Sequence, residues 1–292
     1  MNALYVLLKV SKQGHLQSVR REAFQRSKEP CYIGLMETVR EMHPMMGLRA
    51  IYEQFEPEGI GRDAFISLGL QEGYRVRAVE SPMKTTRSVK NTRFRNLLGD
   101  LRLTGVNQVW VSDIFYFPLG GRHYYVVLIL DVYSRRIIGY SVADNMRAEN
   151  NLAALRMAIQ LRGVYDYQGT LIHHSDRGVQ YTSNDYTELL DDCGIQISMC
   201  IDVLENAHAE RANGTIKNGY LMAWEPKTPE ELFEMVPRSV GNYNNRNHQS
   251  LSKMTPIQYE TYVNELSLEK RPQMTVFTMK QNIENPNQLS LF

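Results

Sequence analysis

Three runs rich in β-branched and aromatic residues follow one another with only short breaks, over residues 109–117, 123–132 and 136–143. A Gly-Gly pair separates the first two runs, and a Ser-Arg turn separates the second from the third. Strands joined by such short connections pair in antiparallel fashion, because a parallel pair needs a long crossover connection. The pattern therefore predicts an antiparallel three-stranded meander, which limits what the rest of the chain can form.

Helices and strands alternate after the meander. The predicted elements are a helix over 146–163, a strand over 170–176, a helix over 183–194, a strand over 195–200 and a helix over about 206–220. The first helix is closed by Gly163, and the second begins at Ser183 and is closed by Gly194. This βββ-α-β-α-β-α order predicts an α/β fold of the ribonuclease-H-like type, with a mixed five-stranded sheet and flanking helices.

The bulk composition excludes several classes of protein. The 292-residue length allows one large domain or two to three smaller ones, and the 43% hydrophobic content is ordinary for a globular protein. The longest apolar run, near Tyr124–Leu130, is far too short to cross a bilayer, so we expect no membrane partner. The N-terminus lacks the features of a signal peptide, and the three cysteines are widely spaced. Both observations favour a reducing, cytoplasmic compartment and argue against a disulfide framework or a zinc knuckle.

Residues 1–80 have a mostly helical pattern. Apolar residues recur at helical spacing between residues 32 and 55, and His43-Pro44 breaks this stretch into two helices. A third short helix ends near Gly73. Short helices joined by tight breaks resemble a helix-turn-helix DNA-binding region, although many small helical domains share the pattern. We therefore expect a small all-α region before the α/β core.

Positive charge is concentrated before the meander. Residues 1–100 carry 16 Lys and Arg against 11 Asp and Glu, whereas the remainder of the chain is net acidic. A Ser/Thr-rich stretch predicts a basic linker over 81–104. Its basic residues include Lys84, Arg87, Lys90, Arg93 and Arg95. Such a linker can lie along DNA phosphates or be a solvated, flexible connector, and charge alone leaves both interpretations open.

Two aspartates occupy the strands predicted to lie at the centre of the sheet. Asp113 lies midway along the first strand among apolar and aromatic residues, and Asp176 ends the strand over 170–176. The sequence around Asp176 can simply form a turn, but a buried carboxylate such as Asp113 is costly without a partner. Aspartates on neighbouring central strands repel one another unless a cation lies between them. Hard cations such as Mg²⁺ prefer oxygen ligands, so we expect a metal site there.

A third carboxylate is expected from the last predicted helix, which packs across this edge of the sheet. Two candidates are present, Glu205 and Glu210. Glu210 lies one helical turn after Asn206 and one turn before Gly214, so these three residues share a face, and Lys217 follows two turns on along the same side. The residues alone leave the choice between the two glutamates open.

Several long motifs resemble the integrase-type catalytic core of Asp-Asp-Glu transposases. They are NQVWVSDIFYF, YYVVLILDVYSRRIIGYSV, HHSDRGVQYTS, ENAHAERANGTIKNGYL and YNNRNHQSLSKMTPIQYE, in this order between residues 107 and 260. The chain most resembles the second-reading-frame protein of bacterial insertion sequences whose core is similar to that of retroviral integrase. The helical segment before the core also resembles that family, so the resemblance extends over most of the chain.

The resemblance implies a DNA transposase that nicks the terminal inverted repeats of an insertion sequence and joins the exposed 3′-hydroxyls to DNA. It implies that Asp113, Asp176 and Glu210 hold two Mg²⁺ ions, with Mn²⁺ able to substitute, for metal-dependent phosphoryl transfer. The sequence departs from the family in a slightly shorter interval between Asp176 and Glu210, which a loop can absorb. It also has Phe115 where a threonine is usual, which puts the packing beside Asp113 in question.

The resemblance also suggests where DNA lies around the site. The basic and polar residues expected to contact it are Arg177, Arg211, Asn213 and Lys217. A simpler interpretation of Lys217 is a solvated lysine. Gly178 is expected to give the turn after Asp176 its backbone freedom. His174, on the same strand face as Asp176, and Asn206 are expected to support the site, although His174 can equally be a satisfied core histidine.

Two further patterns have structural interpretations. The Asp-Val-Tyr-Ser-Arg sequence that begins at Asp131 predicts a turn with a charge pair to Arg135 or Arg136, or a hydrogen bond close to the site. A phrase after the core resembles the same family, but its role does not follow from physical argument, and we expect it to pack the tail against the core. It contains Tyr243, Asn244, Arg246 and His248.

These interpretations divide the chain into four parts. They are a helical DNA-binding region over 1–80, a basic linker over 81–104, an integrase-type core over 105–225, and a C-terminal helical extension and tail over 226–292. By analogy, the expected partners are double-stranded DNA (element ends and target), further copies of the chain and an upstream-frame DNA-binding protein, at the bacterial nucleoid. The rival functions are a non-catalytic DNA-binding regulator derived from a transposase and a structure-selective nuclease of the same fold.

Overall fold

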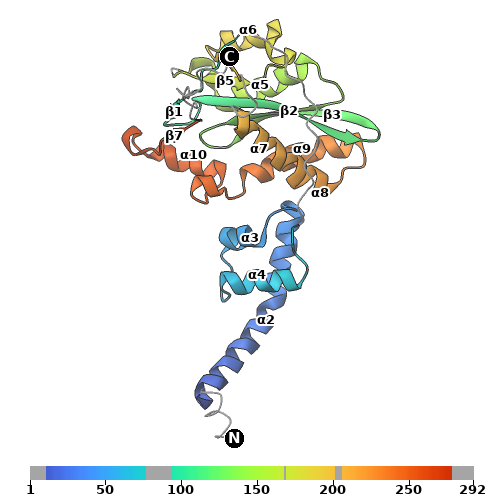
Figure 1. Cartoon of the computed structure of the whole chain (residues 1–292), viewed down its shortest axis with the longest axis vertical. Coiled ribbons are helices and arrows are strands. Elements are labelled where there is room, and N and C mark those ends of the chain that lie inside the picture. Colours follow the sequence, from blue (N-terminus) through green and yellow to red (C-terminus); the bar gives the residue numbers. More distant parts are fainter. Residues whose placement is uncertain (1–10, 77–93, 168, 201–205, 278–292) are drawn as a thin grey trace, which may run out of the picture.

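A computed structural model describes residues 11–76, 94–167, 169–200 and 206–277. A sheet with helices on both sides occupies one end of the molecule, and a group of helices formed by the N-terminal residues projects from it (Figure 1). Within the described ranges, none of the helices combines the length and apolarity that a bilayer crossing requires. Five residues named above lie outside these ranges. They are the basic residues Lys84, Arg87, Lys90 and Arg93 and the alternative glutamate Glu205.

The N-terminal region is all-helical, as the sequence predicts. Its helices are α2 (Lys12–Met42), α3 (Leu48–Phe55) and α4 (Arg62–Gln71). The break falls at His43-Pro44, where His43 caps the C-terminus of α2. The three helices enclose a small core of their own around Met36, Ile51 and Phe65, each fully buried. The N-terminal end of α2 extends away from this core into solvent (Figure 1).

The predicted five-stranded mixed sheet is confirmed. Its strands are β2 (Val109–Leu119), β3 (Arg122–Asp131), β4 (Ile137–Ala143), β5 (Ile172–Ser175) and β6 (Gln196–Met199), in the order β4-β3-β2-β5-β6. β2 pairs antiparallel with β3 and parallel with β5, so it lies at the centre. The strand order and the βββ-α-β-α-β-α connections are those of the ribonuclease-H-like fold.

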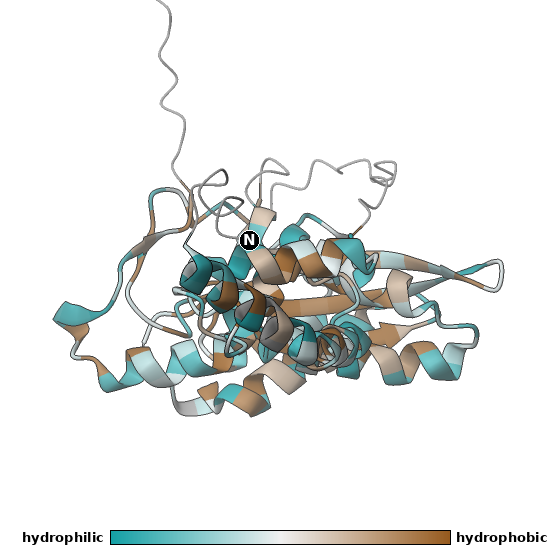
Figure 2. Cartoon of the chain, turned by 90° about the horizontal axis from the view of Figure 1, so that it is seen from below, coloured by the Kyte–Doolittle hydropathy of each residue, from teal (hydrophilic) through white to brown (hydrophobic). Residues whose placement is uncertain are grey.

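Helices cover both faces of this sheet (Figure 1). The covering helices are α5 (Ala148–Arg162) and α6 (Asn184–Asp192) on one face, and α7 (Ala207–Ile216) and α9 (Pro229–Asn244) on the other. Side chains alternate along β2 because successive residues of a strand point to opposite faces. Val111 and Phe115 therefore pack with α7 and α9, whereas Trp110 packs with α5 and α6. In Figure 2 the strands between the helical layers are largely hydrophobic.

The helix predicted to run to about residue 220 changes its winding near the end. α7 gives way to a π-helical turn over Lys217–Leu221 and then to α8 (Met222–Trp224). A π-helical turn adds a residue to the helical turn and is often found near functional sites. Phe115, whose packing the sequence left in question, is buried in the cluster that includes Ala212 and Ile216 of α7. Its packing is therefore satisfied.

The segments on either side of the predicted core pack directly onto it. Leu98 and Leu103, within the stretch assigned to the linker, are fully buried in the main hydrophobic cluster. β1 (Arg102–Leu103) pairs with β7 (Met274–Thr275), so residues before the core and after it form one small sheet. This sheet was not predicted, because strands of two residues are too short to show a hydrophobic period.

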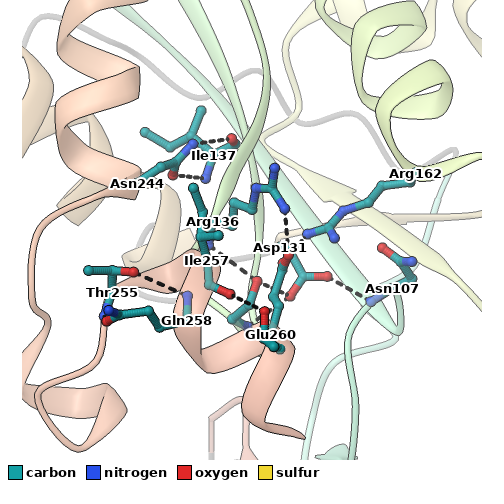
Figure 3. A network of polar contacts seen from close by, with 12 residues as sticks. Asn107, Asp131, Arg136, Ile137, Arg162, Asn244, Thr255, Ile257, Gln258 and Glu260 are labelled. Carbon is teal, nitrogen blue, oxygen red and sulfur yellow. Dashed lines mark hydrogen bonds and ion pairs between the residues drawn. The ribbon is translucent and has the colours of Figure 1, made fainter. Parts of the chain in front are cut away.

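A buried polar network connects the C-terminal extension to the core (Figure 3). Glu260 of α10 (Pro256–Glu265) accepts a hydrogen bond of 2.7 Å from Arg136 Nη1 and forms a second ion pair with Arg162 at the end of α5. Asn244 of α9 bonds both the N–H and the carbonyl of Ile137, at 2.9 and 2.8 Å. The extension is therefore part of the folded unit around the sheet.

Asp131 begins the predicted turn, but without the predicted charge pair. Its Oδ1 accepts hydrogen bonds from the Ser134 N–H and hydroxyl, at 2.8 and 3.0 Å, and its Oδ2 accepts one from the Asn107 N–H at 2.7 Å (Figure 3). The predicted charge pair with Arg135 or Arg136 is wrong, because among the described residues Arg136 pairs with Glu260. Backbone and hydroxyl donors satisfy Asp131 instead.

The pKa of Glu260 reflects its partners. Burial alone would raise this pKa, but the hydrogen bonds and charge of Arg162, with further bonds from Ser134 and Arg136, hold it below its ordinary value of 4.5. A carboxyl group whose folded-state pKa is depressed stabilises the fold above its unfolded pKa and loses that effect as the pH falls through the folded value. Glu260 therefore contributes its full stabilisation at neutral pH.

We predict that Glu260→Gln lowers the free energy of unfolding at pH 7 by about 3 kcal/mol, because it removes the buried carboxylate that pairs with two partly buried guanidinium groups. Urea unfolding, followed by circular dichroism, measures this change. Glu265→Gln, an exposed position on the same helix, is the matched control and is expected to have little effect. The difference between wild type and Glu260→Gln should shrink below pH 4.5, and a difference that is constant with pH would contradict the assignment.

Candidate active site

The parallel pairing of β2 and β5 places two aspartates side by side. Ser112 and Ser175 are partners in the strand register, and Asp113 and Asp176 are the residues that follow them. Both aspartates are half-buried. The two carboxylates thus come from neighbouring central strands, as the sequence suggested, and face the layer that contains α7.

Two asparagine side chains fix α7 over these strands. Asn206, the residue at the N-terminus of α7, donates from Nδ2 to the Ser112 carbonyl at 3.1 Å. Asn213 donates from Nδ2 to Asp113 Oδ2 at 2.9 Å. Glu210 lies between these two asparagines on the same helix face and is exposed to solvent. That Glu210 shares the face of Asn206 stays a prediction from helical spacing, and its charge acts on Asp113.

The electrostatics of Asp113 are those of a carboxylate without a counter-charge. Burial raises its pKa to about 7, with further increases from the charges of Asp176 and, to a smaller extent, Glu210. The Ile114 N–H and the Asn213 amide act in the opposite direction but do not cancel the increase. The negative charges of Asp176 and Glu210 therefore both act on Asp113, and a cation placed beside Asp113 would relieve the repulsion.

Asp176 is held by the turn that follows it. Its Oδ1 accepts a hydrogen bond of 3.0 Å from the Gly178 N–H, while burial raises its pKa. Gly178 has an ordinary φ of −61°, so the expectation that it supplies backbone freedom is wrong. A Cβ at this position would lie 2.6 Å from Gln180 Oε1 and 3.0 Å from Asp176 Oδ1, so a larger residue would require both side chains to shift.

The donor atoms suit a hard divalent cation. In the described part of the chain, no three His, Cys, Asp or Glu side chains converge closely enough to enclose a metal ion by themselves. The site instead offers the carboxylates of Asp113 and Asp176, with Glu210 nearby. The side-chain oxygens of Asn206 and Asn213 are buried there without a hydrogen-bond partner. Mg²⁺ commonly takes one or two carboxylates and leaves positions open for phosphate and water, so this oxygen-rich set fits it.

The two histidines before Asp176 are core residues. His174 is fully buried, and its Nδ1 bonds Ser198 Oγ at 2.8 Å, while its Nε2 has no partner among the described residues. Burial lowers its pKa to about 4, so it is neutral at pH 7. His173 faces the other side of the sheet and bonds the hydroxyl of Tyr186 through Nε2 at 3.0 Å. His174 therefore supports β5 from the face that it shares with Asp176.

The predicted DNA-contacting residues have different surroundings. Arg177 is half-buried, and its Nε donates to the Cys200 carbonyl at 2.9 Å, so part of its guanidinium stabilises the turn. Arg211 and Arg95 are exposed. Lys217 is half-buried at the start of the π-helical turn, and burial lowers its pKa. Asn213 is bound to Asp113, a contact that the sequence did not predict because helical spacing gives a shared face but not the partner.

Sequence comparison identifies the same region of the chain. A family model described as "Integrase core domain" matches residues 104–202, which include both aspartates and the five-stranded sheet. Glu210 lies beyond the matched residues. The comparison thus supports the integrase-type fold of this region.

Proteins of bacterial insertion sequences are similar over longer stretches. The 31 kDa protein of insertion element IS600 from Shigella sonnei is 31% identical over 256 residues, which is 84% of this chain and 90% of that protein. The transposase of insertion sequence element IS629 from the same organism is 30% identical over 70% of each chain. The IS986/IS6110 proteins of Mycobacterium tuberculosis are 35% identical over 161 residues, and the match covers only 58% of their length.

A solved structure has the same fold. A chain of the simian T-cell lymphotropic virus intasome, determined in complex with PP2A regulatory subunit B56 gamma, superposes with a TM-score of 0.50. The two chains are 16% identical, and the match covers 77% of this chain and 72% of the other. This likeness shows the fold, and the sequence similarities show that the chain belongs to the family of insertion-sequence transposases that carry an integrase core domain.

Proposed function

We propose that this protein is an Asp-Asp-Glu transposase that nicks DNA at the terminal inverted repeats of an insertion sequence and joins the 3′-hydroxyls to target DNA. The observation that carries the proposal is the pair of half-buried carboxylates on the adjacent central strands β2 and β5, beneath the face of α7 that presents Glu210. Membership of an insertion-sequence transposase family supplies the class of substrate.

Asp113, Asp176 and Glu210 are the residues proposed to hold two Mg²⁺ ions, with Mn²⁺ as a substitute. When bound, the ions would stabilise charge on the scissile phosphate and lower the pKa of the attacking water or hydroxyl. This chemistry requires no covalent enzyme intermediate, so no Ser or Tyr nucleophile is needed. The protein's own part is to hold the carboxylates, with Asn213 fixing the Asp113 carboxylate and the Gly178 N–H fixing that of Asp176.

The DNA is proposed to lie across the carboxyl ends of β2 and β5 and along α7. Lys217, Arg211 and the free part of the Arg177 guanidinium supply positive charge for phosphates beside the acidic site. The basic segment over 81–104 and the helical region before it are proposed to hold the rest of the DNA. His174 and Asn206 support β5 and α7 rather than touching the substrate.

Transposition requires two ends and a target to be brought together, so we propose that several copies of the chain assemble on DNA in the bacterial cytoplasm. An upstream-frame DNA-binding protein, separate or fused, is the further partner proposed. Two functions compete with this proposal: a DNA-binding regulator without catalysis, and a nuclease that cuts DNA without joining it. The acidic site favours an enzyme over the regulator, because carboxylates that destabilise one another without a cation have no purpose in a passive binding protein.

Strand-transfer assays with labelled DNA ends from the element's own flanks test the proposed ligands. We expect Asp113→Asn, Asp176→Asn and Glu210→Gln each to lower product formation by at least about 100-fold, because a lost ligand removes several kcal/mol of charge stabilisation. Glu205→Gln is the matched control and should retain activity. Nicks without joined product would indicate the nuclease, and DNA binding without any metal-dependent product would indicate the regulator.

Thermal unfolding gives a readout that does not depend on activity. Without divalent cations, Asp113→Asn should raise Tm, because it removes the charge that Asp176 and Glu210 repel and that burial disfavours. Addition of Mg²⁺ should raise the Tm of the wild type and have little effect on the variant, because ligand binding stabilises only the state that binds. A Tm for Asp113→Asn below that of the wild type would contradict the electrostatic account.

Asn213 is proposed to position Asp113, and we predict that Asn213→Ala weakens the Mg²⁺ dependence of the reaction. The concentration of Mg²⁺ at half-maximal rate should rise by about 10- to 100-fold, which is typical when a residue that orients a metal ligand is removed. Saturating Mg²⁺ should restore much of the rate. An unchanged Mg²⁺ requirement with a uniformly lower rate would instead indicate a structural defect in α7.

A further inference from the structure

A cavity of ≈ 520 Å³ lies between the N-terminal helical region and the core, outside the acidic site. Glu53 of α3 lines one side and Arg211 of α7 another. The segment that follows α9 lines the rest of the cavity, with Arg246, His248 and Lys253 as its basic and aromatic-ring residues. Arg246 and His248 belong to the post-core phrase for which sequence reasoning found no role. The structure brings this phrase beside the helix that carries Glu210.

The lining of the cavity is strongly positive. Three cationic side chains face one carboxylate, Glu53, which already forms ion pairs with Arg49 at 3.0 Å and Lys253 at 3.5 Å. Within the described ranges, neither Arg211 nor Arg246 forms an ion pair with an acidic residue. The Nε atom of Arg246 is also buried without a hydrogen-bond partner.

The charges of three arginines act on one buried tyrosine beside this lining. Arg246 lies over the ring of buried Tyr243, with 5.9 Å between its guanidinium carbon and the ring centroid. Burial raises the pKa of Tyr243 to about 12, while the charges of Arg246, Arg135 and Arg211 act to lower it. Burial also lowers the pKa of Arg135, and the charge of Arg211 lowers it further. Arg211 and Arg246, which form no ion pair among the described residues, therefore supply positive charge that would stabilise an anion here.

The walls of the cavity are fixed to one another. His43 Nδ1 lies 2.9 Å from the Tyr220 hydroxyl, and Asn242 Nδ2 donates to the Met42 carbonyl at 2.6 Å. The Asn247 N–H donates to Gln54 Oε1 at 3.0 Å, which attaches the post-core loop to α3. The N-terminal helices are therefore docked on the core through contacts on both sides of the cavity.

The loop at the rim has an unusual backbone. Ser252 and Lys253 have φ values of 54° and 64°, in the left-handed region that residues with a side chain rarely adopt. The His248 N–H donates to the Met254 carbonyl at 3.0 Å, and the Lys253 N–H donates to the His248 carbonyl at 3.1 Å, so the loop is closed on itself. Buried Leu251 anchors it. The loop thus places Lys253 Nζ 3.5 Å from Glu53 Oε1.

We propose that this cavity binds the phosphodiester backbone of the DNA substrate, so that the N-terminal region, α7 and the post-core phrase together form one DNA-binding cleft. The inference rests on the proposed transposase function and names a part of its DNA path. Arg211 directly follows Glu210, so DNA at the acidic site lies within reach of the cavity. No Phe, Tyr or Trp lines the cavity within the described residues, which favours backbone phosphates over a stacked base.

Salt-dependent binding of the full chain to a duplex from the element end tests this proposal, with Kd measured by fluorescence anisotropy. We expect Arg211→Gln with Lys253→Gln to weaken binding and to reduce the slope of log affinity against log salt concentration by about two, roughly one for each lost phosphate contact. Both side chains are exposed, so the change is compatible with folding, which the melting temperature checks. Lys227→Gln, an exposed lysine outside the cavity paired with Glu225, is the matched control.

Duplexes with single methylphosphonate groups, which remove one phosphate charge at a time, locate the contact. The wild type should lose affinity at one or two backbone positions, and the double variant should show no further loss at those positions. A double variant whose affinity and salt slope match those of Lys227→Gln would overturn the cavity proposal. If the double variant binds DNA as the control does and the wild type nicks DNA with Mg²⁺, only the cavity proposal fails and the transposase proposal survives. If the wild type does not bind DNA at all, both proposals fail.

Discussion

The repulsion between Asp113 and Asp176 is the constraint around which this molecule is organised. Parallel pairing of β2 with β5 brings the two carboxylates together at the centre of the sheet, where burial and mutual charge raise the pKa of Asp113 to about 7. A fold tolerates such a pair only if the surrounding structure holds it in place. The hydrogen bonds from Asn213 and the Gly178 N–H supply that support, and the proposed function adds a divalent cation between the carboxylates.

α7 connects the acidic pair to the rest of the molecule. Its Asn206 and Asn213 attach it to β2, its buried face packs against the sheet, and Arg211 reaches the basic cavity on another side. The negative charge of Glu210 therefore acts on the acidic pair, and the positive charge of Arg211 lies at the cavity beside the N-terminal helices. One short helix can do both because successive residues point in directions roughly 100° apart.

Much of the fold could be predicted from sequence. The meander, the helix that ends at Gly163 and the break at His43-Pro44 all follow from periodicity and local backbone preference, which are properties of contiguous residues. The pairing of β1 with β7 and the ion pairs of Glu260 could not be predicted. Their partners are far apart in sequence, and neither hydrophobic period nor turn chemistry carries information about them. For Asp131 the turn was predictable, but local pattern did not show that Ser134 and Asn107, rather than an arginine, satisfy its oxygens.

The sequence by itself determined the order of the elements and the strand positions of Asp113 and Asp176, because apolar runs and polar interruptions specify strands locally. It also placed Asn206 and Glu210 on one helix face, because that face depends only on spacing. The tertiary structure alone decided that Asn213 bonds Asp113, that the Gly178 N–H bonds Asp176, and that Arg246 lies with Arg211 beside α3. Each of these is a contact across the packed molecule, and chain folding rather than local pattern sets which side chains meet.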